Sequence, residues 1–510
     1  MALTITIIAL ATAVFGLLTT LIYTKLHFKR FEEYRGIPQL RQSLILGNLK
    51  TIYDYTLYGE RDRHLDHGFT EMLEALGRPQ LMLVDIWPLR SPLLVVGSQE
   101  IAEQLCRPTN LFPWGSPKCS MLTAGGKEWL VLRKKNNPAF SHQRVLVSVP
   151  TIIDKVEIFI DKLDQHMFTG DEFSLLALCA DLALDVIGQV VLGIDLDAQL
   201  QRPSKLARDF LELMSTYDGL LTVISQLDEE SVDNSLAEHI RQKFKANSTE
   251  ALRQNHSVLS QRLQDIPALD PLIVAEISDQ LKTFLLAGRD TTGITLAWAL
   301  YELSRTPGAL RPVRLEADAV LGPGTDLVTI RTTLGSDRRD LLGRMPFTHA
   351  VIRQTLRLHP PGGAMRYSDK HNGLTVCNAT TGQTHCLDGL AIYLCEPVIH
   401  RDVAVYGDSA NVFVPERWAA LGAAAKIPPS AWRPFERGPR ACIGQELAML
   451  EVCLVLALVC RRYDFVKVGL GRNLLGAKGE EVLDERTGQF KAASEMYKPL
   501  QVAAQPLLIL

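Results

Sequence analysis

The sequence predicts a mainly α-helical protein with small β-sheets, attached to one apolar N-terminal helix. Three observations lead to this fold class: stretches with helical periodicity dominate the chain, strand-like stretches are few and short, and residues 2–24 are uncharged and mostly apolar. Long helices with short strands near the two ends are typical of an α-rich domain with small sheets. The expected helices cover 151–165, 172–193, 204–227, 235–264, 271–306, 308–321, 346–358 and 443–460, and the expected strands cover 80–86, 93–96, 374–376, 391–394 and 500–504.

The apolar run at residues 2–24 is long enough to cross a membrane, because a hydrocarbon core of ~30 Å needs about 20 helical residues. Basic residues follow this run, at Lys25, Lys29, Arg30 and Arg35. A cleaved signal peptide is the competing interpretation, but there the positive charges precede a shorter apolar region. We therefore expect a membrane anchor with its basic flank at residues 1–35, followed by one large domain at 36–510 on the cytosolic side.

Composition excludes several classes of protein. A net charge of −3, with 47% hydrophobic and 22% charged residues, fits a globular protein with a large core and gives no argument for nucleic-acid binding. The nine cysteines are odd in number, scattered, and contain no Cys-x-x-Cys pair. This spacing argues against a disulfide framework and a zinc site, and it fits a reducing compartment.

The most informative stretch is Phe-Glu-Arg-Gly-Pro-Arg-Ala-Cys-Ile-Gly at 435–444, directly before a helical pattern. A helix N-terminus offers free N–H groups and a positive dipole end, which stabilise a thiolate such as that of Cys442. Gly438 and Gly444 allow a tight turn and the close approach of a flat ligand, and Arg440 can pair with a carboxylate on that ligand. For a lone cysteine, a buried structural role is the alternative interpretation.

As a whole, the pattern Phe-x-x-Gly-x-Arg-x-Cys-x-Gly resembles the haem-thiolate loop of the cytochrome P450 family. The resemblance covers essentially the whole chain and is greatest to microsomal enzymes of filamentous fungi that act in secondary metabolism. It implies a single haem domain in which Cys442 is the axial ligand of haem b, near Phe435, Gly438 and Gly444, and Arg440 meets a haem propionate. It also implies a membrane location in the endoplasmic reticulum and a lipophilic substrate such as a polyketide, terpenoid or alkaloid. The electrons are expected from NADPH through the FAD and FMN of a partner reductase, with cytochrome b5 as a further donor.

A second segment, Ala-Gly-Arg-Asp-Thr-Thr at 287–292, interrupts a long apolar helical pattern with residues that suit a helix poorly. A tolerated kink at a helix-packing contact is one interpretation, and a groove for a small molecule is the other. The segment resembles the family's oxygen-binding site, which would place Ala287 and Gly288 beside the cofactor. Asp290 and Thr291 would then handle protons during cleavage of the O–O bond.

A third segment departs from the family. The resemblance leads one to expect Glu-x-x-Arg on the helix at 346–358, linked to the arginine of a later Pro-Glu-Arg run, here Arg417. This chain keeps Arg357 but has Gln354 in place of the glutamate. Arg357 and Arg417 would therefore lie close together with one neutralising carboxylate fewer. From the sequence we expect that Gln354→Glu raises thermal stability without changing the product.

Weaker matches complete the expected pocket. Trp129 and Arg133 resemble the family's propionate-binding helix, and Arg366 resembles a further propionate contact; core packing and a surface charge are the alternatives. A basic face for an electron donor is expected at Lys134, Lys135, Arg433 and Arg437, where merely solvated charges are the alternative. The expected apolar substrate contacts, for which core packing is the alternative, are Phe112, Trp114, Met121, Leu122, Phe284, Met365 and Met496.

Three functions follow from these observations. The first is a monooxygenase that uses O2 and NADPH. The second is a haem-thiolate isomerase or peroxide-rearranging enzyme that needs no external electrons, and the intact pair of Asp290 and Thr291 argues against it. The third is a non-enzymatic haem protein, in which that pair would have no purpose.

Overall fold

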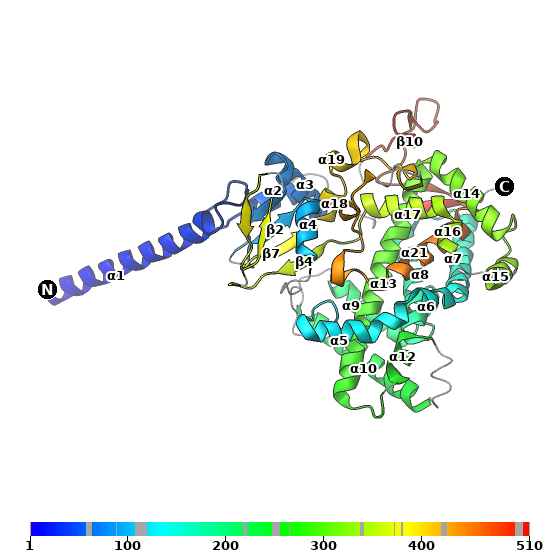
Figure 1. The fold of residues 1–510 in the computed structure, drawn as a ribbon, viewed down its shortest axis with the longest axis horizontal. Coiled ribbons are helices and arrows are strands. Elements are labelled where there is room, and N and C mark those ends of the chain that lie inside the picture. Colours follow the sequence, from blue (N-terminus) through cyan, green and yellow to red (C-terminus); the bar gives the residue numbers. More distant parts are fainter. Residues whose placement is uncertain are drawn as a thin grey trace. The chain divides into compact units, whose positions relative to one another are not determined.

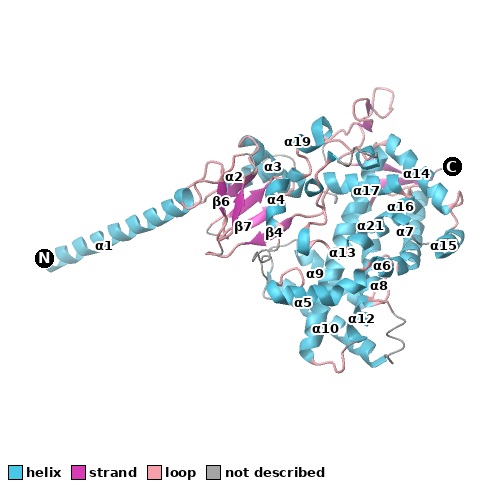
Figure 2. Ribbon diagram, in the orientation of Figure 1, coloured by secondary structure: helices cyan, strands magenta, loops and turns pink. Residues whose placement is uncertain are grey.

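The computed structural model describes residues 2–57, 64–87, 89–107, 120–217, 222–246, 256–264, 266–336, 341–371, 373–378, 381–419, 426–494 and 503–508. These residues are mostly helical, with a few short strands gathered into small sheets (Figures 1 and 2), as the sequence predicts. The chain forms two compact units, and both are discontinuous in sequence. Unit 1 combines Met1–Trp114 with Gly363–Ile399, and unit 2 combines Gly115–Gly362 with His400–Leu510.

Unit 1 is built on a four-stranded sheet in the order β1-β2-β7-β4. Strands β1 and β2 are antiparallel, with Leu81 opposite Val96, whereas β2 and β7 are parallel. Strands β1, β2 and β7 are apolar and almost entirely buried, as expected for strands that are covered on both faces. The elements of this unit are α1 (Ala2–His27), the π-helix η1 (Phe28–Glu32), α2 (Leu49–Leu57), α3 (Leu65–Ala75), β1 (Leu81–Val84), β2 (Leu93–Val96), α4 (Gln99–Leu105), β4 (Ala364–Tyr367), β5 (Thr375–Cys377), β6 (Thr384–Cys386), β7 (Ala391–Leu394) and α18 (Glu396–Ile399).

The N-terminal helix α1 has the length and composition of a membrane span. The candidate span is Thr4–Glu32, and none of its most apolar window is buried within the protein. Helix α8 of unit 2 is almost as apolar, but most of its window is buried, as expected for a core helix. Of the four basic residues after the apolar run, Arg30 is buried in an ion pair with Asp85, so the exposed basic flank is smaller than the sequence suggests.

Unit 2 holds the large hydrophobic core, and its longest helix is α13, which packs against α8, α17, α14 and α21 (Figure 1). Its sheets are β3-β11-β8 and β10-β9. The principal helices are α5 (Gly126–Asn136), α6 (His142–Val147), α7 (Val149–Thr169), α8 (Leu175–Leu192), α9 (Lys205–Tyr217), α10 (Thr222–Ala246), α12 (Val258–Gln264), α13 (Pro271–Arg305), α14 (Pro307–Leu321), α15 (Leu327–Ser336), α16 (Leu341–Arg344), α17 (Pro346–Leu358), α19 (Val403–Tyr406), α20 (Glu416–Ala419) and α21 (Gln445–Val459). The strands are β3 (Phe173–Ser174), β8 (Tyr463–Val468), β9 (Leu483–Asp484), β10 (Gln489–Phe490) and β11 (Ala503–Leu508).

Most predicted elements are present, with their ends shifted by a few residues. The expected helix at 204–227 corresponds to α9 and the start of α10, and the one at 235–264 corresponds to the rest of α10 and to α12; residues 218–221 and 247–255 lie outside the described part of the chain. The sequence did not predict β3, β4, β6, β8, β9 or β10. In β4 every residue is half-buried, so the alternation of apolar and polar residues that reveals a strand is missing.

Candidate functional site

The cysteine loop, residues 435–444, leads directly into the start of α21. Its backbone closes on itself, because the Cys442 N–H donates to the Phe435 carbonyl at 2.8 Å and the Ala441 N–H donates to the Gly438 carbonyl at 3.1 Å. Gly438 has φ = 75°, a conformation that only glycine adopts without strain. The Cys442 side chain is exposed in this loop, unlike Cys179, Cys453 and Cys460, which are buried.

Opposing effects act on the Cys442 thiol. The protein atoms around it raise the pKa of Cys442 by desolvation, while N–H donors from Gly444 and Gln445 and the charge of Arg133 act to lower that pKa. The donors at the helix N-terminus are those that a thiolate needs, and a bound metal cation would favour the thiolate further. A Cβ atom at Gly444 would lie 3.9 Å from the Cys442 sulfur, so a larger side chain there would enter the space beside the thiol.

Helix α5 and the cysteine loop are joined by two arginines. Arg133 Nη1 donates to the Ala441 carbonyl at 2.9 Å, and Arg440 Nη2 donates to the Ala124 carbonyl at 3.0 Å. The Arg440 guanidinium also lies 4.6 Å above the Trp129 ring. Burial lowers the pKa of Arg133, as expected for a cation held partly away from water. The structure thus brings together Trp129, Arg133 and Arg440, the residues expected to face the carboxylates of a flat ligand.

Helix α13 is buried along most of its length but exposes Ala287 and Thr291, which share one face at a spacing of four residues. The Thr291 hydroxyl donates to the Ala287 carbonyl at 2.7 Å, so it remains inside the helix's own hydrogen-bonding pattern. Asp290 is half-buried and forms an ion pair with Arg289, a partner that the sequence analysis missed although it is the adjacent residue. Because α13 packs against α21, one unit carries both the cysteine loop and the acid and hydroxyl residues.

Gly288 also lies at a close contact between α13 and α8. A Cβ atom there would lie 2.6 Å from Cγ1 of Ile187 on α8, so glycine is needed for close packing of α13 on α8. Helix α13 continues without interruption through 287–292. Gly288 thus takes part in helix packing, and its expected place beside the cofactor stays a prediction.

The residues of the third segment lie together in unit 2. Gln354 accepts a hydrogen bond from Arg357 Nε at 3.2 Å, and both side chains are fully buried. Arg417 donates to the Ser409 carbonyl and hydroxyl and to the Tyr406 carbonyl, rather than to Gln354. The expected link between residue 354 and Arg417 is therefore replaced by other contacts.

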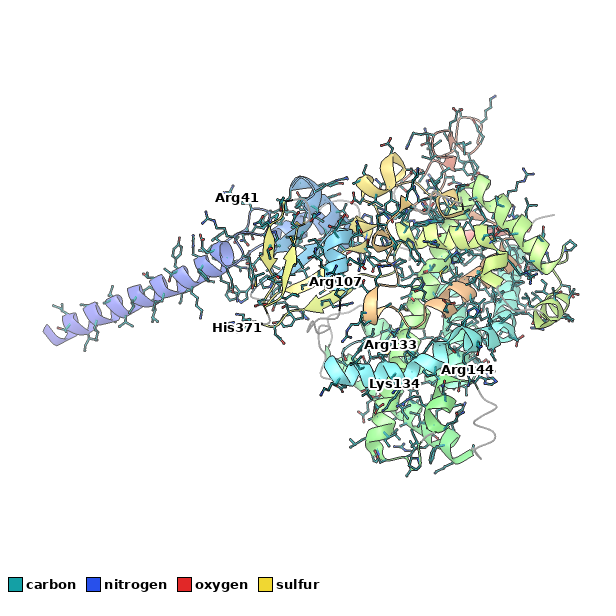
Figure 3. All side chains as sticks on the ribbon, in the orientation of Figure 1. Arg41, Arg107, Arg133, Lys134, Arg144 and His371 are labelled. Atoms are coloured by element: carbon teal, nitrogen blue, oxygen red, sulfur yellow. The ribbon has the colours of Figure 1, made fainter. Side chains whose placement is uncertain are left out.

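Two further expectations need correction or stay untested. Arg433 is buried and paired with Glu436, so it cannot belong to a basic docking face. Lys134 on α5 is exposed (labelled in Figure 3), while Lys135 pairs with Glu276. Arg366 lies on β4 of unit 1, where it donates to the Met365 carbonyl, and its contact with a propionate stays a prediction.

The expected substrate contacts are only partly covered by the described residues. Phe284 is buried, with its ring 5.2 Å from that of Phe140, and Met121 is also buried, which agrees with core packing. Leu122 is 57% exposed, and Met365 is half-buried on β4 of unit 1. The other three, Phe112, Trp114 and Met496, lie outside the described residues.

Comparison with known proteins identifies the family of this chain. Residues 92–473 match the model of the cytochrome P450 family. The chain is 29% identical to the cytochrome P450 monooxygenase acrF of Aspergillus aculeatus, over 79% of this chain and 88% of that protein. It is 25% identical to the cytochrome P450 monooxygenase polC of Polytolypa hystricis, over 87% and 84% of the two chains. A bifunctional cytochrome P450/NADPH–P450 reductase of Gibberella moniliformis is 27% identical over 85% of this chain and 39% of its own length. The chain is therefore a member of the cytochrome P450 monooxygenase family, whose cofactor is haem iron.

Proposed function

We propose that this protein is a membrane-anchored monooxygenase that inserts one oxygen atom from O2 into a lipophilic intermediate of secondary metabolism. The exposed Cys442 thiol, with N–H donors from the N-terminus of α21 directed at it, carries the proposal. When bound, haem supplies the oxygen-activating chemistry. Two of the fungal relatives are named as monooxygenases, which supports the reaction class.

The protein's own residues have three tasks in this reaction. Cys442 holds the iron, and the backbone N–H groups of Gly444 and Gln445 stabilise its negative charge. Arg133 and Arg440 would bind the haem carboxylates, because both guanidinium groups lie where the cysteine loop meets α5 and the residues before it. Thr291 holds a hydrogen-bonded water on the open face of α13, and Asp290 passes protons to it from solvent.

Electrons are proposed to come from NADPH through a separate flavoprotein reductase that carries FAD and FMN, with cytochrome b5 as a further donor. Relatives in which a cytochrome P450 is fused to an NADPH–P450 reductase support this kind of partner. The exposed Lys134 on α5 offers a positive charge for an acidic partner surface. We place the anchor in the endoplasmic reticulum membrane, as the family resemblance implies. The catalytic part would face the cytosol, because Lys25, Lys29 and Arg35 follow the apolar run at residues 2–24.

The first test is spectroscopic. Haem-loaded protein, reduced and exposed to CO, should show the absorption band of a thiolate-ligated haem, and Cys442→Ala should lose that band. Purified reductase should then support NADPH and O2 consumption, and ¹⁸O from ¹⁸O2 should appear in products from a lipophilic metabolite extract. A folded, haem-loaded protein without the thiolate band would refute the proposal. Turnover of the extract without NADPH would favour the isomerase instead.

A further inference from the structure

Gln354 on α17 is fully buried and makes three hydrogen bonds that fix the orientation of its amide. Its Oε1 accepts from Arg357 Nε at 3.2 Å and from Trp418 Nε1 at 2.9 Å, and its Nε2 donates to the Val412 carbonyl at 2.8 Å. The guanidinium and indole N–H groups can only donate, and the carbonyl can only accept. An amide in this orientation satisfies all three partners, whereas an ionised carboxylate offers no donor to Val412.

Among the described residues, the Arg357 guanidinium is held by hydrogen bonds to carbonyls rather than by an ion pair with a carboxylate. Its guanidinium donates to three main-chain carbonyls, those of His400 at 2.8 Å, Ala410 at 2.6 Å and Val412 at 3.1 Å. Its face lies 4.6 Å from the centre of the Tyr406 ring. Burial, together with the nearby charge of Arg417, lowers the pKa of Arg357 to about 9. Carbonyl dipoles and an aromatic face therefore stabilise this cation, a task that the family resemblance assigns to a glutamate at position 354.

Trp418 connects Gln354 to the cysteine loop through a series of contacts. The Arg353 guanidinium lies between two indoles, 4.3 Å from the Trp418 ring and 4.7 Å from the Trp432 ring. Trp432 Nε1 donates to the Arg353 carbonyl at 3.0 Å, and the Trp432 ring lies 6.2 Å from that of Phe435. Phe435 is the first residue of the cysteine loop, and its carbonyl accepts the N–H of Cys442.

We propose that Gln354 and Trp418 are positioning residues, a matched amide–indole pair that fixes the cysteine loop in place of a charged glutamate–arginine link. The pair acts through Arg353, Trp432 and Phe435, and the proposal rests on the proposed role of Cys442 as the haem ligand. It reverses the sequence-based expectation for Gln354→Glu. An ionised carboxylate would place an oxygen 2.8 Å from the Val412 carbonyl oxygen, where a hydrogen bond now exists.

The test compares the haem-loaded parent with Gln354→Glu, Gln354→Met, Trp418→Phe and the double variant Gln354→Met/Trp418→Phe. Two quantities are measured: the Tm, and the fraction of the reduced CO complex that shows the thiolate-type band. Gln354→Glu should lower the Tm by ~2–6 °C. Gln354→Met and Trp418→Phe should each lower both quantities, and the double variant should lose less than the sum, because both substitutions remove the same hydrogen bond.

Trp298→Phe is the matched control, because its ring stacks on His359 in the same unit, outside this series of contacts. It should lower the Tm without changing the thiolate fraction. An unchanged or higher Tm for Gln354→Glu, additive losses in the double variant, or equal thiolate fractions in Trp418→Phe and Trp298→Phe would each overturn the proposal. If Gln354→Met does not fold, then Gln354→Glu, Trp418→Phe and Trp298→Phe still test the proposal. A parent without the thiolate band would refute the proposed function, while the Tm comparison would still test the pair.

Discussion

The buried ion pair between Arg30 and Asp85 should control how firmly the end of the anchor is attached to unit 1. Arg30 Nη1 lies 2.6 Å from Asp85 Oδ2, and the two side chains are 0% and 3% exposed. Arg30 also donates to the carbonyls of Leu44, Ile45 and Trp87. Because Arg30 lies in η1, directly after α1, these bonds fasten the last turn of the anchor helix to the loops before α2 and after β1.

Asp85→Asn removes the negative charge and leaves the buried Arg30 guanidinium without a counter-charge. Removing one partner of a buried pair costs about 3–5 kcal/mol, and every ~1.4 kcal/mol changes an equilibrium tenfold. The population in which this attachment is open should therefore rise on the order of 10²-fold or more. Trypsin can cut the bond after Arg30 only in that open state, so the cleavage rate should rise by the same factor when closing is faster than cleavage.

The assay is limited trypsin digestion of the full chain in lipid nanodiscs, with cleavage between Arg30 and Phe31 followed by mass spectrometry. Asp54→Asn is the matched control, because Asp54 pairs with Lys50 on an exposed face of α2 and such pairs contribute little. Its cleavage rate should stay within about twofold of the parent's. If Asp85→Asn is cut no faster than Asp54→Asn, the ion pair does not hold the anchor and the reasoning fails.

Two further predictions concern unit 2. Gly293→Ala should lower the Tm more than Gly288→Ala. A Cβ atom at 293 would lie 2.8 Å from the backbone of Ala180, whereas a Cβ atom at 288 would meet the side chain of Ile187, which can move. Equal decreases in Tm for the two variants would contradict this prediction. Burial and the neighbouring arginines lower the pKa of His400 to about 3. Below about pH 6.5 the unfolded state therefore binds a proton on His400 that the folded state does not bind. The free energy of unfolding should consequently fall as the pH drops from 6.5 toward 3, and His400 contributes up to ~1.4 kcal/mol per pH unit to this fall. Denaturant titrations at several pH values should show a shallower pH dependence for His400→Gln, and an unchanged slope would refute this assignment.

The parts of the site that depend on local backbone were predictable from the sequence. The turn at Gly438, the loop closure from Phe435 to Cys442 and the helix that starts at Gln445 all follow from residues close together in the chain. Contacts between distant segments were not predictable from these residues. Arg133 and Ala441 are 308 positions apart, and only the family resemblance suggested that they belong to one site.

The division into two units also has no signal along the chain. Unit 1 ends at Trp114 and takes up the chain again at Gly363, and no change in composition marks either point. The cause is topological, because β7 must pair in parallel with β2, and these strands are nearly 300 residues apart in sequence. A composition scan detects local preferences, whereas this boundary depends on strand pairing at long range.

Gln354 shows why a difference from a family pattern cannot be judged by counting charges. In the sequence, an amide in place of a carboxylate looks like a loss, because the arginines that need a counter-charge are visible. The groups that replace that charge are not visible: they are the carbonyls of His400, Ala410 and Val412, which every sequence contains and only a fold can direct at Arg357. The Val412 carbonyl also accepts from the amide, so the backbone that stabilises the cation would repel a carboxylate. The amide is therefore suited to its surroundings, and restoring the family residue alone should destabilise the protein.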